Sequence, residues 1–164
     1  MKNKAEDLEE VLYEEEKSDQ DWIIQIGFLI HDTARLRRVV LDEKFKPLSI
    51  TRSQAWLLAY LSRSEGLPQS ALADQMGLGK VALGGLIDRL EGNGLIERRS
   101  DPKDRRINNI FLTEKGKNVT TEMRQLTLEA NKDILKDVDI EQVKSGVKLL
   151  TKLKQNLQWL RDNQ

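Results

Sequence analysis

The feature that most constrains the fold is the run of residues 69–112, where two short helical patterns precede two β-type patterns. The stretch "QSALADQMG" predicts a helix of about two turns ending at Gly77, and residues 79–93 predict a second helix directly after it. After Gly94, "LIERR" and "INNIFLT" are typical of strands and are separated by the charged, proline-containing loop "SDPKDRR". This order predicts a helix-turn-helix followed by a β-hairpin wing.

Longer helical patterns flank this run on both sides. Residues 22–45 predict a long helix with a broad apolar face, which Pro47 ends. A capping box at Thr51 and Gln54 predicts the start of the next helix. We expect its apolar side to consist of Trp56, Leu57, Tyr60 and Leu61.

Two more helices are predicted after the wing. Thr113 caps the first, which runs to about Lys136, and Asp139 starts the second. Steps of three and four separate the apolar residues of the last helix: Ile140, Val143, Val147, Leu150, Leu153, Leu157 and Leu160. Such a stripe predicts a partner helix, and we expect a second copy of the chain to supply it. The fold class expected is mainly α with a small β-hairpin wing.

Charge is distributed unevenly along the 164 residues, although the formal net charge is zero. Residues 1–21 hold three lysines against nine acids, so residues 22–164 carry a net charge of +6. We expect this acidic tail to be disordered or at most to form a short, loosely docked helix. An acidic tail thus masks a basic body, although the net charge alone does not indicate a nucleic-acid partner.

The residue types present argue against several function classes. There is no cysteine and one histidine, so we expect no thiol chemistry, no metal site, no cofactor and no catalytic set. The chain is therefore not expected to be an enzyme. Apolar runs are far shorter than the roughly 20 residues that span a bilayer, and the N-terminus does not resemble a secretory signal. We expect no membrane partner and a cytoplasmic location.

Basic side chains gather in the predicted wing. The candidate DNA contacts there are Arg99, Lys103, Arg105 and Arg106. Guanidinium groups on a narrow hairpin suit phosphates and the negative potential of a narrow minor groove. A charged turn alone is more often a solvated surface loop, but its place directly after a helix-turn-helix favours the DNA-binding interpretation.

Two glycines interrupt the predicted helix over residues 79–93. Its core side is expected to be Leu83, Leu86, Ile87 and Leu90, which leaves Val81, Gly84, Gly85 and Asp88 facing outward. Each glycine costs about 1 kcal/mol relative to alanine in a helix interior. Either the glycines let the helix lie deep in a DNA groove, or they permit tight packing against the preceding helix.

These residues resemble the MarR family of bacterial transcription regulators. The resemblance lies in "LADQMG", "LIDRLEGNGLIERR", "DPKDRR" and "LTEKG", with "T-x-x-Q-x-W-x-L" at Thr51–Leu58, and it covers about residues 22–162. It implies a winged helix-turn-helix core flanked by long dimerisation helices. Members are typically homodimers on pseudo-palindromic duplex DNA, and many release it when small phenolic or other aromatic acids bind.

The resemblance also implies a division of the chain and roles for its residues. Residues 49–113 would form the DNA-binding domain, and residues 22–48 and 114–162 the dimerisation region. The helix over residues 79–93 would lie in the major groove, with candidate contacts from Lys80, Val81, Ala82, Gly84, Gly85 and Arg89. Arg106 matches the arginine of the family's D-x-R wing motif, in which Asp104 is the acid. Asp88 matches an aspartate that would steady a wing arginine.

The glycine pair departs from the polar pair that many members carry at these positions. Bidentate base recognition from the centre of the helix is therefore not expected. We expect phosphate and thymine-methyl contacts from its margins, with further specificity from the wing and from DNA shape.

An effector site is expected between the lobes. The candidate ligand-binding residues are Phe28, His31, Arg35, Trp56 and Tyr60. The leading interpretation is a dimeric DNA-binding regulator of transcription, with repression as the expected mode. The alternative is a winged-helix protein-interaction module without DNA binding, which the bare helix face and the acidic tail would favour.

Overall fold

The computed structural model describes residues 18–104 and 106–163, which divide into two compact units. The units are Met1–Val40 and Leu41–Gln164. Most of the acidic tail expected over residues 1–21 lies outside the described residues.

The first unit contains most of α2 (Asp19–Phe45), which begins three residues earlier than the sequence predicts. Ser18 and Asp21 close its first turn, where the Ser18 amide donates a 3.0 Å hydrogen bond to Asp21 Oδ2. None of the residues of α2 is buried. Its exposed large apolar side chains are Trp22, Ile23, Ile24, Phe28, Leu29, Ile30, Leu36, Val39 and Val40.

The second unit begins with the end of α2, the 3-10 turn η1 (Lys46–Leu48) and α3 (Arg52–Leu61). The predicted capping box is confirmed, because Thr51 accepts from the Gln54 amide and the Gln54 side chain accepts from the Thr51 amide.

The expected apolar side of α3 is partly wrong. Trp56 is 51% exposed and Tyr60 is only half-buried, whereas Leu57, Leu58 and Leu61 are fully buried. The inward stripe starts at Gln54 and continues at i+3, i+4 and i+7. Because the first position of this stripe is the polar residue Gln54, the apolar residues alone indicated a face that includes Trp56 and Tyr60.

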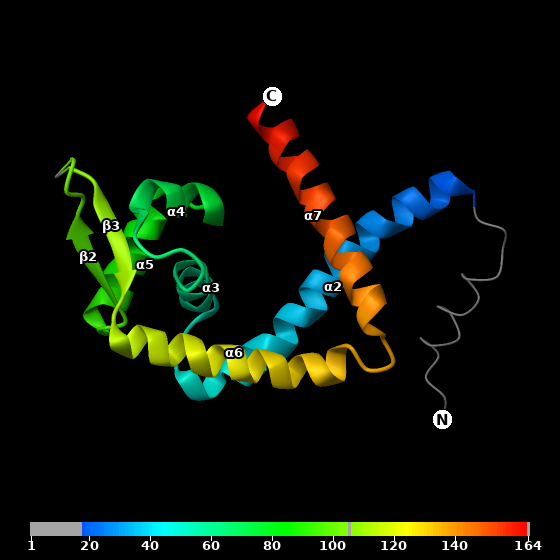
Figure 1. The fold of residues 1–164 in the computed structure, drawn as a ribbon, viewed down its shortest axis with the longest axis horizontal. Helices are drawn as coiled ribbons and strands as arrows, with labels where there is room; N and C mark the ends of the chain where they lie inside the picture. The colour runs from blue at the N-terminus through cyan, green and yellow to red at the C-terminus, as the bar shows by residue number, and fades with distance from the viewer. Residues whose placement is uncertain (1–17, 105, 164) are drawn as a thin grey trace. The chain divides into compact units, whose positions relative to one another are not determined.

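A helix-turn-helix and a small sheet follow (Figure 1). The elements are β1 (Leu67–Pro68), α4 (Gln69–Met76), α5 (Lys80–Gly92), β2 (Ile96–Ser100) and β3 (Asn108–Leu112). All pairs in the sheet are antiparallel, and the strand order is β1-β3-β2. The two-residue β1 was not predicted, since a short segment with proline has no alternating pattern.

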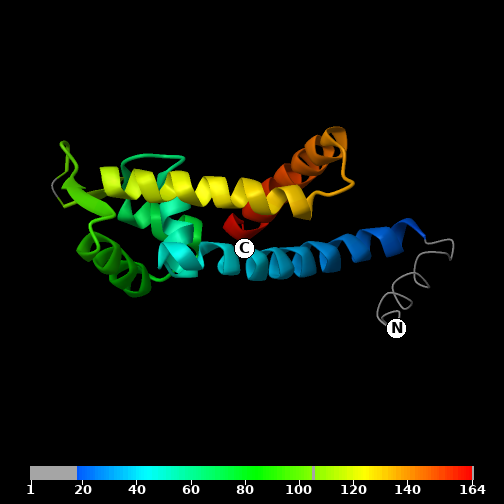
Figure 2. The same cartoon turned by 90° about the horizontal axis from the view of Figure 1, so that it is seen from below.

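Two straight helices, α6 (Glu114–Ile134) and α7 (Ile140–Asp162), complete the chain, and α6 leaves the end of β3 directly (Figure 2). Thr113 caps α6 by accepting a 3.1 Å hydrogen bond from the Gly116 amide, and Asp139 forms a capping box with Gln142 at α7. Both predicted starts are confirmed.

One hydrophobic core lies within the winged helix-turn-helix part of the second unit. Its fully buried large side chains are Leu57, Leu58, Leu61, Leu72, Leu83, Ile87, Leu90, Ile96 and Ile110. They come from α3, α4, α5 and the two longer strands, so the core fixes the helix-turn-helix against the wing. The prediction of a mainly α chain with a small β-hairpin wing is confirmed.

Candidate nucleic-acid interface

The turn between α4 and α5 is built by Gly77, which ends α4 in the left-handed conformation at φ 62°. The Leu78 amide donates a 3.0 Å hydrogen bond back to the Ala73 carbonyl, and Gly79 caps α5. The inward side of α5 is buried as predicted, at Leu83, Leu86, Ile87 and Leu90. The opposite face of α5 is therefore held toward solvent.

That outward face has no polar side chain along most of its length. Val81 is 92% exposed, and Lys80, Ala82, Asp88 and Arg89 are also exposed. No residue from position 81 to position 87 has a polar side chain. Hydrogen-bonding side chains are thus confined to the two ends of the exposed face.

The two glycines of α5 have room for side chains among the described residues. A methyl group built on Gly85 meets nothing within 4 Å, and one built on Gly84 meets only Gln69 Nε2, at an ordinary 3.8 Å. The interpretation that the glycines permit tight packing against α4 is therefore wrong. Nothing in the described chain requires a glycine at either position.

An arginine brace connects the outward face of α5 to the wing. The Arg98 guanidinium of β2 forms ion pairs with both Asp88 and Glu91 of α5, and the Arg98 amide donates a 3.0 Å hydrogen bond to Glu91 Oε1. Burial alone would lower the pKa of Arg98, but the hydrogen bonds to the two carboxylates outweigh it and raise that pKa. The Arg98 guanidinium is therefore paired within the chain. Its partner Glu91 was not identified from the sequence.

Asp101 organises the turn at the tip of the wing. Its Oδ1 accepts hydrogen bonds from the amides of Lys103 at 2.8 Å and Asp104 at 3.2 Å, and its Oδ2 accepts one from Asn109 Nδ2 at 2.9 Å. The Lys103 amide bond is the main reason that the pKa of Asp101 lies below its ordinary value, with Asn109 and Asp104 adding to it. Only the folded hairpin brings Asn109 to this carboxylate, so the sequence pattern did not reveal it.

Arg106 is the most exposed cation of the wing that carries an ion pair, at 90% side-chain exposure. Its Nε and Nη2 atoms donate to the two carboxylate oxygens of Asp104, at 3.0 and 2.9 Å. The Arg106 side chain holds the pKa of Asp104 below its ordinary value. One face of the guanidinium is thus oriented by the chain while the group itself stays in solvent.

The other wing candidates differ in their surroundings. The Arg99 guanidinium lies 4.4 Å from the centre of the Phe111 ring and also pairs with Glu97. Lys103 is exposed at the tip, and Arg105 lies outside the described residues. Of these cations, Arg99 is positioned by an aromatic face and Arg106 by a carboxylate.

A pocket of about 270 Å³ lies where α4, α5 and the wing meet. Lys80 and Arg106 both border it, so cations from the helix and from the hairpin open onto one concavity. The remaining lining residues are Gln69, Ser70, Ala73, Leu83, Ile107 and Asn108. This arrangement suits a ligand with repeated negative charges.

The residues expected to bind an effector fall into both units. Phe28, His31 and Arg35 lie on α2 in the first unit and are exposed. Trp56 and Tyr60 lie on α3 with ring centres 6.0 Å apart, and the Tyr60 hydroxyl donates a 3.2 Å hydrogen bond to the Gln75 carbonyl.

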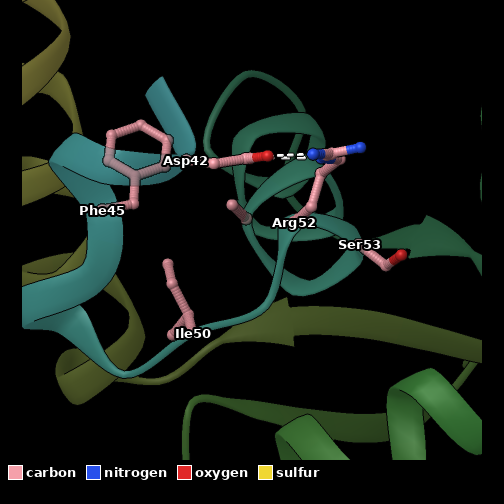
Figure 3. Close-up of a pocket in the computed structure, with 6 residues that line it drawn as sticks. Asp42, Phe45, Ile50, Arg52 and Ser53 are labelled. Atoms are coloured by element: carbon pink, nitrogen blue, oxygen red, sulfur yellow. Dashed lines mark hydrogen bonds and ion pairs between the residues drawn. The ribbon is translucent and has the colours of Figure 1, made fainter. Parts of the chain in front are cut away.

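Two pockets lie on either side of Arg52. A pocket of about 300 Å³ is lined by Trp56, Tyr60, Arg52, Ser53, Gln75, Met76 and Leu78. Figure 3 shows the other, of about 310 Å³, in which Phe45 and Ile50 face the Asp42–Arg52 ion pair. Its Arg52 Nε donates a 3.1 Å hydrogen bond to Asp42 Oδ1, so this guanidinium already has a carboxylate partner.

Two other kinds of site are absent from residues 18–104 and 106–163. Within these ranges, no three histidine, cysteine or acidic residues come together as metal ligands. None of the helices described there is both apolar enough and long enough to span a bilayer.

Comparison with known proteins gives a consistent result. Residues 48–107 match the sequence profile described as the MarR family. The apo form of wild-type MarR from E. coli is 26% identical, with a TM-score of 0.68 over 77% of this chain and 95% of that one. A MarR transcriptional regulator from Methanosarcina mazei Go1 is 28% identical, with a TM-score of 0.70 over 81% and 96%.

A third similar structure contains DNA. It is a mutant MarR from E. coli complexed with operator DNA, 26% identical with a TM-score of 0.69, and it covers 84% of this chain and 99% of that one. The matched profile falls on the helix-turn-helix and the wing, and the shared fold extends well beyond them. The chain therefore matches the MarR family over residues 48–107 and has the fold of that family's transcription regulators.

Proposed function

We propose that the chain is a transcription regulator that binds duplex DNA, with α5 in the major groove and the wing tip at the adjacent minor groove. The observation that carries this proposal is the pocket bordered by both Lys80 and Arg106. Phosphates line both edges of each groove, so cations from a helix and from a hairpin contact one strand together. A similar protein, a mutant MarR from E. coli, is complexed with operator DNA, which supports DNA as the partner.

The brace and the wing turn support this assignment. Arg98 fixes β2 to α5 through two carboxylates, and Asp101 fixes the tip of the hairpin. A surface whose cations are held in place loses less conformational entropy when it binds. Lys80, Arg89, Arg99, Lys103 and Arg106 are the described candidates for DNA contact, and Arg105 is the candidate outside the described residues.

We assign a homodimer to this regulator on the basis of its exposed apolar side chains. On α7 the exposed members of the predicted stripe are Ile140, Val147, Leu150, Leu157 and Leu160, and α2 exposes a second apolar set. Covering such surface yields roughly 25 cal/mol for each Å² removed from water. A two-fold dimer places two α5 helices about 34 Å apart, which suits a pseudo-palindromic site.

Regulation by a small molecule completes the proposal. The pocket beside Trp56 and Tyr60 is lined by these two aromatic residues and by the polar residues Arg52, Ser53 and Gln75, which suits a small aromatic or phenolic ligand. Binding there acts on α3 and the end of α4, which hold the helix-turn-helix. We propose that the regulator represses transcription by occupying its site and that such a ligand releases it.

The test is a fluorescence-anisotropy titration of duplexes that tile the DNA flanking the chain's own gene, at 50 and 200 mM salt. The expected result is one tightly bound duplex, with log K falling by about 0.9 per phosphate contact for each unit of log salt. Arg106→Ala should weaken binding and flatten this slope, whereas Lys152→Ala, an exposed lysine of α7, should change neither. Salicylate should release the bound duplex.

Three results would contradict the proposal. If no duplex binds in a salt-dependent way, DNA binding is refuted and the protein-interaction alternative is favoured. If Lys152→Ala has the same effect as Arg106→Ala, the assigned face is wrong. A monomer in size-exclusion chromatography with light scattering at micromolar concentration would contradict the dimer.

A further inference from the structure

The outward face of α5 has an unusual composition for a helix that meets DNA. Donor side chains stand only at its ends, at Lys80 and Arg89, while Asp88 is paired with Arg98. Between them the exposed side chains are the isopropyl group of Val81 and the methyl group of Ala82. This part of the face has nothing with which to donate to or accept from a base edge.

Gly84 and Gly85 extend this apolar surface into an open strip. Methyl groups built at the two positions meet no closer atom than Gln69 Nε2 at 3.8 Å, so the described chain leaves the space unfilled. Each glycine also destabilises the helix by about 1 kcal/mol relative to alanine. The space therefore suits a small group that comes from outside the chain.

The major groove offers one kind of apolar group. Guanine, cytosine and adenine present only hydrogen-bonding atoms there, whereas thymine adds its C5-methyl. An isopropyl group beside an open glycine strip matches a methyl in size and polarity.

We infer that α5 selects thymine through its C5-methyl group, with Val81 as the specificity-determining residue and the Gly84–Gly85 strip as the space that admits the methyl. The inference rests on the proposed function, because it requires α5 to lie in the major groove. It adds a sequence preference: thymine at the base pairs that face the first turns of α5.

The experiment removes only the methyl. The full chain selects its preferred sites from a pool of random 24-base-pair duplexes, and each thymine of the winning site is then replaced by uracil, one position at a time. At the positions facing Val81 we expect binding to weaken about fourfold, the effect of one buried methyl group. At the same positions, thymine is also replaced by cytosine and by 5-methylcytosine. These two bases differ only in the methyl group, so tighter binding of the 5-methylcytosine duplex is expected if the methyl alone is sufficient.

Two variants separate this inference from the proposed function. Val81→Ala should lower the thymine-over-uracil ratio toward one while keeping the salt slope. Arg106→Ala should weaken all duplexes and keep the ratio. If no duplex is bound, the proposed function has failed.

If the chain binds DNA but tolerates uracil at every position, the inference alone is overturned. An unchanged thymine-over-uracil ratio in Val81→Ala would rule out Val81 as the residue responsible.

Discussion

Replacing both glycines of α5 with alanine should stabilise the protein. Methyl groups at Gly84 and Gly85 meet no atom closer than 3.8 Å, so the change adds no steric strain. Each substitution removes a helix penalty of about 1 kcal/mol, which gives about 2 kcal/mol for the pair. For a chain of this length, that corresponds to a rise in Tm of roughly 4–8 °C.

The assay is urea and thermal denaturation followed by circular dichroism, at one fixed protein concentration because a dimer's stability depends on concentration. The Gly84→Ala/Gly85→Ala variant is compared with the unmodified chain. A variant that is equally stable or less stable would refute the reasoning, because the glycines would then have a packing role that the structure does not contain.

The same position also tests close approach to DNA. Gly84→Arg should fold with unchanged or higher stability, since the site is open, but should bind the site selected by the unmodified chain about tenfold or more weakly. If Gly84→Arg folds and binds that site normally, the helix does not approach the groove closely at this point.

Three further predictions concern the scaffold. Gly116→Ala should destabilise the chain by about 3 kcal/mol, because its Cβ would lie 2.0 Å from the Leu95 carbonyl oxygen; an unchanged Tm would contradict this. Arg98→Met should cost about 1 kcal/mol in urea denaturation and speed amide exchange in β2, since it leaves two carboxylates unpaired; unchanged exchange would argue against the brace. The pKa of Asp101 is lowered by folding, so its contribution is present above about pH 4 and is lost as the pH falls through the folded value. Protection of the Lys103 amide from exchange, relative to its intrinsic rate at each pH, should therefore be lost only in that acidic range. An Asp101 titration by NMR at or above the ordinary value would contradict the wing geometry.

Local signals in the sequence were sufficient for the elements that position the candidate interface. The apolar spacing of α5, the glycine that ends α4 and the caps at Thr51, Thr113 and Asp139 each act within a few residues, so the sequence displays them directly. The wing was predictable for the same reason, because a β-type run, a charged turn and a second β-type run are adjacent.

What the sequence did not reveal depends on contacts that the fold creates. Glu91 and Arg98 are seven positions apart on different elements, and Asp101 and Asn109 lie on opposite sides of the wing turn. Trp56 was wrongly assigned to the buried side of α3, because its spacing to Tyr60 fits a helical stripe as well as the spacing of the residues that are in fact buried. Only the packing of α3 distinguishes the two stripes.

The absence of cysteine from the chain allows the most direct test of the account's central claim, that α5 enters the major groove. A single Val81→Cys substitution at this exposed position is combined with a selected duplex that carries a thiol tether in its major groove. Disulfide cross-linking should occur in good yield with Val81→Cys and only at background with Lys152→Cys on α7. Equal yields from the two variants, or a higher yield from α7, would contradict the account.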